Sequence, residues 1–185
     1  MKVLKWILGG LVGILLLLFI VLYFLSDGMS GIVENRTEIE IEKPANQVFT
    51  WISESEKLKQ WMHGLKEDIP INGDSLRVGS KSKIIVEDEQ GRFEMIVEIT
   101  QLKMNELLAV HITSEGFEVN AVYKLSESGD VTTLNYEGRA HFKSLFLRLI
   151  TFVIKPASQQ QLENNFNKLK SLVEAEQWET TIEEE

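Results

Sequence analysis

The segment SLFLRLITFVIKPASQQQLENNFNKLKSLVEAE, residues 144–176, decides the fold predicted for this chain. In its second half, apolar residues recur at spacings of four, three and four, the period of a helix with one buried face. These residues are Leu162, Phe166, Leu169 and Val173. Ser158 and Gln161 match a capping box, which predicts a helix start just after Pro156. The first half, from Leu145 to Ile154, is apolar nearly all round, so a helix there must be covered on most sides.

The chain between residues 36 and 143 predicts short strands. Residues 37–41 alternate between apolar and acidic side chains, as in a half-buried strand. Two short helices follow, one opened by Pro44 and one by a capping box of Ser53 and Glu56, with an apolar stripe that ends at Leu65. Further strands are expected at 82–87, 92–102, 107–113, 118–125 and 131–142. Because the connections are short, the strands form an antiparallel meander. We therefore expect an α+β fold with a sheet wrapped around the terminal helix.

Composition limits the classes of function. The 185 residues, 44% of them hydrophobic, suit one domain plus an appendage. There is no cysteine, which excludes disulfides, thiolate metal sites and a cysteine nucleophile. The formal net charge is −9, and every acidic residue follows position 25. Since an acidic domain repels phosphate backbones, we expect no nucleic-acid partner.

The N-terminal segment from Trp6 to Leu25 contains no charged residue. As a helix it would cover about 30 Å, the thickness of the hydrocarbon core of a bilayer. The run is longer than the apolar region of a signal peptide and lacks a small-x-small cleavage site, so we expect a retained single-pass transmembrane anchor over residues 1–25. Lys2 and Lys5 precede it and Asp27 follows it, which predicts a cytoplasmic N-terminus and a domain outside the cytoplasm.

Three further parts are predicted after this anchor. Residues 26–35 form a short tether that would hold the domain against the bilayer surface. Residues 36–177 form the folded domain. Residues 178–185 are an acidic tail.

The order of elements resembles the START-related superfamily, also called SRPBCC, which includes the birch pollen allergen fold and the polyketide cyclase/dehydrase and lipid transport proteins. The resemblance spans about residues 36–176. It rests on Lys43-Pro-Ala leading to Val48-Phe-x-Trp, on Trp61, on Val78-Gly-Ser, on Asn105-Glu-Leu-Leu-Ala and on Leu169-Lys-Ser-Leu-Val-Glu. It implies a helix-grip fold with a cavity for an apolar ligand between the curved sheet and the long C-terminal helix. The superfamily has no shared catalytic motif, so the resemblance assigns no catalytic residue.

Strand parity identifies the side chains that would line such a cavity. One face of each strand is apolar, and two tyrosine hydroxyls are its main polar groups. We expect the lining to comprise Trp61, Phe93, Met95, Tyr123, Leu134, Tyr136 and Phe166. Parity does not distinguish a hollow interior from a filled one, so a packed core is the alternative.

Other chemistry finds little support in the sequence. His63, His111 and His141 have no metal-ligand spacing, and by parity the latter two lie on the polar face, so we expect no metal. Glu94 and Glu98 share the outer face and are expected to be solvated. No cofactor fingerprint is present.

These observations predict a domain that binds a lipid or other apolar small molecule next to a membrane, without catalysis. Residues 145–154 could pack against the sheet or contact the membrane between Lys143 and Lys155. One alternative is an enzyme of the cyclase or dehydratase type that uses Tyr123, Tyr136 or a histidine as acid or base. Another is an interaction module without a cavity.

Overall fold

A computed structural model describes residues 2–25, 30–73, 76–88 and 91–176, with α1 side chains described for Trp6 and residues 9–21. The helices are α1 (Lys2–Leu25), α2 (Ala45–Ser53), α3 (Ser55–Trp61), α4 (Leu145–Leu149) and α5 (Thr151–Ala175). The strands are β1 (Ile32–Ile41), β2 (Leu65–Pro70), β3 (Lys81–Asp88), β4 (Gly91–Lys103), β5 (Leu107–Thr113), β6 (Phe117–Ser128) and β7 (Val131–Phe142).

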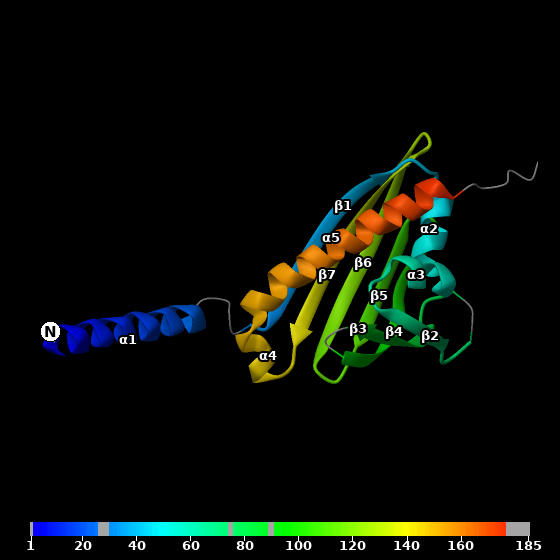
Figure 1. Cartoon of the computed structure of the whole chain (residues 1–185). Coiled ribbons are helices and arrows are strands. Elements are labelled where there is room, and N and C mark those ends of the chain that lie inside the picture. The colour runs from blue at the N-terminus through cyan, green and yellow to red at the C-terminus, as the bar shows by residue number, and fades with distance from the viewer. Residues whose placement is uncertain (1, 26–29, 74–75, 89–90, 177–185) are drawn as a thin grey trace, which may run out of the picture.

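The strands form one antiparallel sheet in the order β1-β7-β6-β5-β4-β3-β2, and α5 runs across its concave face (Figure 1). The pair α2 and α3 covers the same face beside the C-terminal half of α5. The helix-grip fold expected from the sequence is confirmed. The five strands expected after residue 80 are all present, because each is bounded by a tight turn that forces the chain back along its neighbour.

Two N-terminal features differ from expectation. Strand β1 begins at Ile32, five residues early, because its register with β7 continues to the pair Ile32 and His141. Strand β2 was missed, since Leu65 was assigned to the stripe of the preceding helix. Helix α3 ends at Trp61, and Gly64, with a φ of +73°, then turns the chain so that Leu65 enters a ladder opposite Val86.

Both predicted capping boxes are wrong. Helix α5 begins at Thr151 and includes Pro156. The Ser158 hydroxyl donates to the carbonyl of Lys155 rather than capping a helix. A proline in this position removes one backbone hydrogen bond, and packing of the following turns against the sheet compensates. The Ser53 hydroxyl likewise donates back to the carbonyl of Phe49 at the end of α2.

The apolar run of residues 145–154 is not covered on most sides as expected. It is divided at Ile150 between α4 and the first turn of α5. Four large apolar side chains are more than half exposed: Leu145, Phe146, Phe152 and Val153. Arg148 ties α4 to the sheet by donating from Nε to the carbonyl of Phe142, and its side chain lies over Gly31. Contact of this run with a membrane stays a prediction.

The predicted single-pass membrane location is wrong. Residues 6–25 are helical, as expected, and α1 extends away from the sheet in Figure 1. Within the described part of the chain, however, no helix is both long enough and apolar enough to cross a membrane. The predicted cytoplasmic N-terminus and external domain depended on this span, so these predictions are wrong as well.

Two predicted segments cannot be compared with the structure. The proposed acidic tail, residues 178–185, and residues 26–29 of the tether lie outside the described residues.

The core lies under the C-terminal half of α5. Phe166 is 1% exposed and packs edge-on against Trp61 of α3, with 5.8 Å between ring centroids. From the sheet, Tyr123 and Tyr136 place their rings 6.3 and 5.5 Å from the Phe166 ring. We call Trp61, Tyr123, Tyr136 and Phe166 the aromatic cluster. Because it joins α3, α5, β6 and β7, it fixes the helices on the sheet.

Glu176 fixes the C-terminal end of α5. Its carboxylate accepts from Lys57 Nζ at 2.8 Å and from the Trp51 indole, and its carbonyl accepts from Lys43. Partial burial raises the pKa of Glu176, but the hydrogen bonds from Lys57 and Trp51 and the lysine charges outweigh this, so the pKa lies below its usual value. The carboxylate therefore stays ionised at neutral pH and holds α2 and α3 to the end of α5.

Truncation of the aromatic cluster should destabilise the domain strongly. We expect Trp61→Ala and Phe166→Ala each to lower the free energy of unfolding by about 3–5 kcal/mol, because each leaves a cavity among buried neighbours. His141→Ala on an exposed position should change it by less than about 0.5 kcal/mol. Urea denaturation of the three variants measures these differences. Equal, small changes in all three would contradict the assigned faces.

Candidate functional site

A hollow lies between the sheet and the first half of α5. Its volume is about 270 Å³. Its walls come from β1, β4, β5, β6, β7 and α5, and most of the side chains are apolar. They are Val33, Asn35, Met95, Ile112, Phe117, Val119, Tyr136, Ala140, Phe142, Ile154 and Ser158, with Gly138 beneath them. We call this the inner pocket. Among these described lining residues none carries a charge.

Small residues facing each other explain why this space is not filled. Ile154, Ser158, Leu162 and Phe166 follow one another at four-residue spacing and form the stripe of α5 toward the sheet. Phe166 fills its end of the stripe, whereas Ser158 is short. On the sheet, Gly138 and Ala140 are equally small. The helix and sheet therefore touch at the aromatic cluster and remain apart toward the start of α5.

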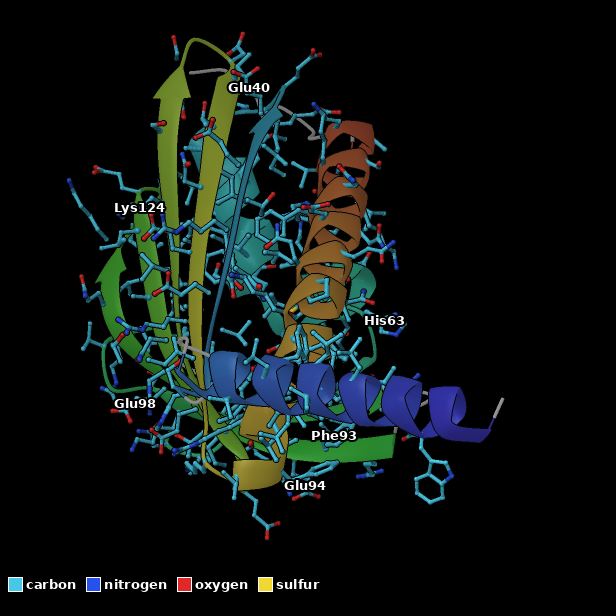
Figure 2. The ribbon with its side chains drawn as sticks, turned by 90° about the vertical axis from the view of Figure 1, so that its left-hand side faces the viewer. Glu40, His63, Phe93, Glu94, Glu98 and Lys124 are labelled. Atoms are coloured by element: carbon cyan, nitrogen blue, oxygen red, sulfur yellow. The ribbon has the colours of Figure 1, made fainter. Side chains whose placement is uncertain are left out.

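The inner pocket opens into a wider one at the end of the sheet. This mouth pocket has a volume of about 980 Å³ and shares Met95, Phe117, Phe142 and Ile154 with the inner pocket. The β3–β4 and β5–β6 hairpins and α4 surround it. Leu147 of α4 packs over Gly116, where an added Cβ would lie 3.2 Å from its Cδ1 atom. Figure 2 shows Phe93 and Glu94 at this end of the molecule. The mouth also carries Arg92 and Glu115, so charge appears only outside the inner pocket.

The seven residues predicted to line a cavity separate into two groups. Met95 and Tyr136 line the inner pocket, and Phe93 lies at the mouth with 42% of its surface exposed. Trp61, Leu134 and Phe166 are at most 2% exposed and lie in the packed core. Tyr123 does not line the inner pocket; its ring lies parallel to that of Phe166 and edge-on to that of Tyr136, with 4.9 Å between the tyrosine centroids.

Sequence reasoning missed most of the inner pocket. Phe117 and Val119 carry the same parity as Tyr123, so extending that strand by one residue would have included Phe117. Ile154 and Ser158 were missed because the helix was expected to begin after Pro156. Asn35 was assigned to the tether, although the alternation of β1 extends to it.

Both tyrosines are uncharged hydrogen-bonding groups at neutral pH. Burial raises the pKa of Tyr136 to about 12, and burial together with the neighbouring Tyr136 raises the pKa of Tyr123 further. Neither hydroxyl forms a hydrogen bond with any other residue that the structure describes. These groups can therefore donate to a ligand, but they do not act as bases.

The remaining titratable candidates lie away from the inner pocket. His111 is paired with Asn120 at 2.9 Å, and His63 and His141 are exposed. In the described residues no cluster of three or more histidine or acidic side chains could hold a metal ion. Glu94 and Glu98 form ion pairs with Lys83 and Lys81. In Figure 2, Glu98 and Lys124 point away from α5, on the convex side of the sheet.

Comparison with known proteins identifies the family. Residues 42–174 match the family described as activator of Hsp90 ATPase homolog 1-like protein. The chain belongs to this family. The family is part of the SRPBCC superfamily, so the resemblance found in the sequence is confirmed. A search of curated protein sequences gave no match.

Solved structures share the fold of this family member at low sequence identity. A conserved protein from Geobacillus kaustophilus is 18% identical with a TM-score of 0.60, over 76% of this chain and 95% of the other. Ara h 8.0201 is 12% identical with a TM-score of 0.61, over 79% and 100%. DynU16, from the dynemicin biosynthetic locus, is 12% identical with a TM-score of 0.57, over 77% of this chain and 47% of its own. At these identities the likeness concerns the fold alone.

The buried tyrosine should be visible in alkaline titration. Subtracting the alkaline titration of Tyr136→Phe from that of the parent protein gives the tyrosinate absorbance of Tyr136. Its titration midpoint should lie near pH 12 rather than near pH 10, because burial disfavours the charged form. Since the folded-state pKa is the higher one, stability should be intact below pH 10 and decline as the pH rises from about 10 to 12. Tyr136→Phe should weaken that decline. A difference spectrum with a midpoint near 10 would mean that Tyr136 is open to solvent.

Proposed function

We propose that this domain binds an apolar small molecule non-covalently in the inner pocket. The observation that carries this proposal is a partly open hollow of about 270 Å³ whose described lining contains apolar and neutral polar side chains and no charge. Pockets of this character suit ligands that bury most of their surface. Members of the SRPBCC superfamily typically bind hydrophobic ligands, which supports the same function for this chain.

The energy of binding would come from removal of apolar ligand surface from water. Each methylene group buried contributes about 0.8 kcal/mol, so affinity should rise roughly fourfold per added carbon until the inner pocket is filled. Longer chains would continue into the mouth pocket along Met95, Phe117 and Ile154, which line both spaces. The phenyl ring of Phe93 would then contact the outer part of the ligand.

The end of the sheet near α4 is the proposed entrance. Exposed apolar side chains surround it on the helical side, namely Leu145, Phe146, Phe152 and Val153. A ligand could leave water for this surface before it enters between Leu147 and Phe93. Because α4 is a helix of only five residues, a small shift of it would widen the opening.

A binding role is favoured over catalysis. An enzyme of the cyclase or dehydratase type would need a base directed into the pocket. Tyr123 and Tyr136 are protonated at neutral pH, and the three histidines lie elsewhere.

The exposed apolar side chains of α4 and early α5 also support a second candidate, an interaction module. In that case the surface of Leu145, Phe146, Phe152 and Val153 would bind a partner while the interior had only a structural role. The two candidates differ in whether the inner pocket accepts a ligand.

A matched pair of substitutions tests the proposed function. Ala140 lines the inner pocket on β7, whereas Ala121 on neighbouring β6 is 1% exposed and lies against packed side chains. Ala140→Phe should abolish binding of 2-nonanone, measured by headspace gas chromatography, and change the free energy of unfolding by less than about 1 kcal/mol, because the ring occupies existing space. Ala121→Phe should overpack and cost about 1–3 kcal/mol.

The opposite pattern of stability and binding would contradict the proposed function. If Ala140→Phe destabilises the domain as much as Ala121→Phe and the parent protein binds no 2-nonanone, the interior is filled. The interaction module would then be the better account.

A further inference from the structure

Three neutral polar side chains meet at the end of the inner pocket that is far from the mouth. Asn35 on β1, Tyr136 on β7 and Ser158 on α5 line the inner pocket but not the mouth pocket. Asn35 is the cross-strand partner of Gly138. The Tyr136 hydroxyl lies over the same glycine, since a Cβ added there would be 2.5 Å from it. Cross-strand Cβ positions are about 5 Å apart, so the hydroxyl and the Asn35 side chain are neighbours.

Gly138 is what allows this arrangement. Any side chain at this position would push the Tyr136 ring away, because the added Cβ would also lie 2.9 Å from two ring carbons. Tyr123, the cross-strand partner of Tyr136 on β6, lies edge-on to the ring, with 4.9 Å between the centroids. The contacts of the ring with Gly138 and Tyr123 therefore hold the hydroxyl at one place in the pocket.

Asn35 and Ser158 already bond to each other, whereas Tyr136 does not. Asn35 Nδ2 donates to the Ser158 hydroxyl at 2.9 Å, and that hydroxyl donates to the carbonyl of Lys155 at 3.0 Å. The Tyr136 hydroxyl has no hydrogen-bond partner among the described residues, and it is not among the fully buried polar atoms, so it faces the open space of the inner pocket. A ligand that covered this hydroxyl without bonding to it would leave a buried polar group unpaired, which is unfavourable. A ligand oxygen at this point would remove that penalty.

The surroundings exclude a charged ligand group. No lysine, arginine, histidine, aspartate or glutamate is among the described residues that line the inner pocket. A carboxylate or ammonium group moved there would lose its hydration without gaining an opposite charge, which is far more costly than moving a neutral oxygen. Arg92, Glu94 and Glu115 lie only at the mouth.

We infer that the ligand of this pocket is an uncharged amphiphile with one carbonyl or hydroxyl oxygen, which accepts a hydrogen bond from Tyr136, and with an apolar chain that runs toward the mouth. The inference rests on the proposed function and adds the chemical class of the ligand and its orientation. The polar end enters first and lies beside Asn35, and the chain lies along Met95, Phe117 and Ile154. Tyr136 is then the residue that determines specificity.

The test compares three nine-carbon probes, 2-nonanone, nonane and nonanoate, on the full chain and two variants. Tyr136→Phe should weaken 2-nonanone binding roughly 2- to 12-fold, the value of one neutral hydrogen bond, and change nonane binding by less than about twofold. Tyr123→Phe is the matched control, because it removes a hydroxyl that does not line the pocket. It should leave both affinities unchanged. Nonanoate should bind at least about tenfold more weakly than 2-nonanone.

The outcomes separate this inference from the proposed function. If none of the probes binds the parent protein, the proposed function fails and the inference with it. If nonane and 2-nonanone bind but Tyr136→Phe affects them equally, or if nonanoate binds best, the pocket binds ligands and the inference is wrong. A second measurement needs no variant: the infrared carbonyl band of ¹³C-labelled 2-nonanone should shift to lower frequency on binding, as for a hydrogen-bonded ketone. An unshifted band would also overturn the inference.

Discussion

The contact of Phe166 with its aromatic neighbours is the interaction on which the rest of this structure depends. One ring on α5 meets Trp61 from α3, which is buried, and the two tyrosines from the sheet, which are partly buried. Trp61 in turn donates its indole N–H to the carbonyl of Trp51, which connects α2. Burial of rings of this size contributes several kcal/mol each. A single position therefore sets the distance and angle at which α5 crosses the sheet.

Because that distance is set at one end, the other end is left open. Beyond the aromatic cluster, α5 and the sheet present Ser158, Gly138 and Ala140 to each other, and these side chains are too small to fill the gap. Rigid packing and a ligand-sized hollow thus result from the same helix on the same sheet face. The five-residue helix α4 and its exposed apolar neighbours lie where the hollow opens. The C-terminal half of α5 therefore stabilises the fold, and its N-terminal half lines the inner pocket.

The sequence predicted the architecture because strand alternation and helical period are local patterns that burial enforces. It predicted the site only in part. Parity placed Met95 and Tyr136 on the inner face, and both line the inner pocket. It could not show that Phe166 and Trp61 fill their share of that face, since filling depends on contacts distant in sequence. The start of α5 was predicted wrongly for another reason. A proline usually begins or ends a helix, but Pro156 lies inside α5, where packing against the sheet compensates. Asn35 and Ser158, separated by 123 residues, could be paired only by the fold.

The central claim is that this interior is hollow at one end and filled at the other. Xenon binds apolar cavities and does not enter packed cores, so crystals of the full chain under xenon pressure test it directly. The account predicts an anomalous peak among Met95, Ile112, Val119 and Ala140, and none between Trp61 and Phe166. No xenon at the first position, or xenon within the aromatic cluster, would contradict it.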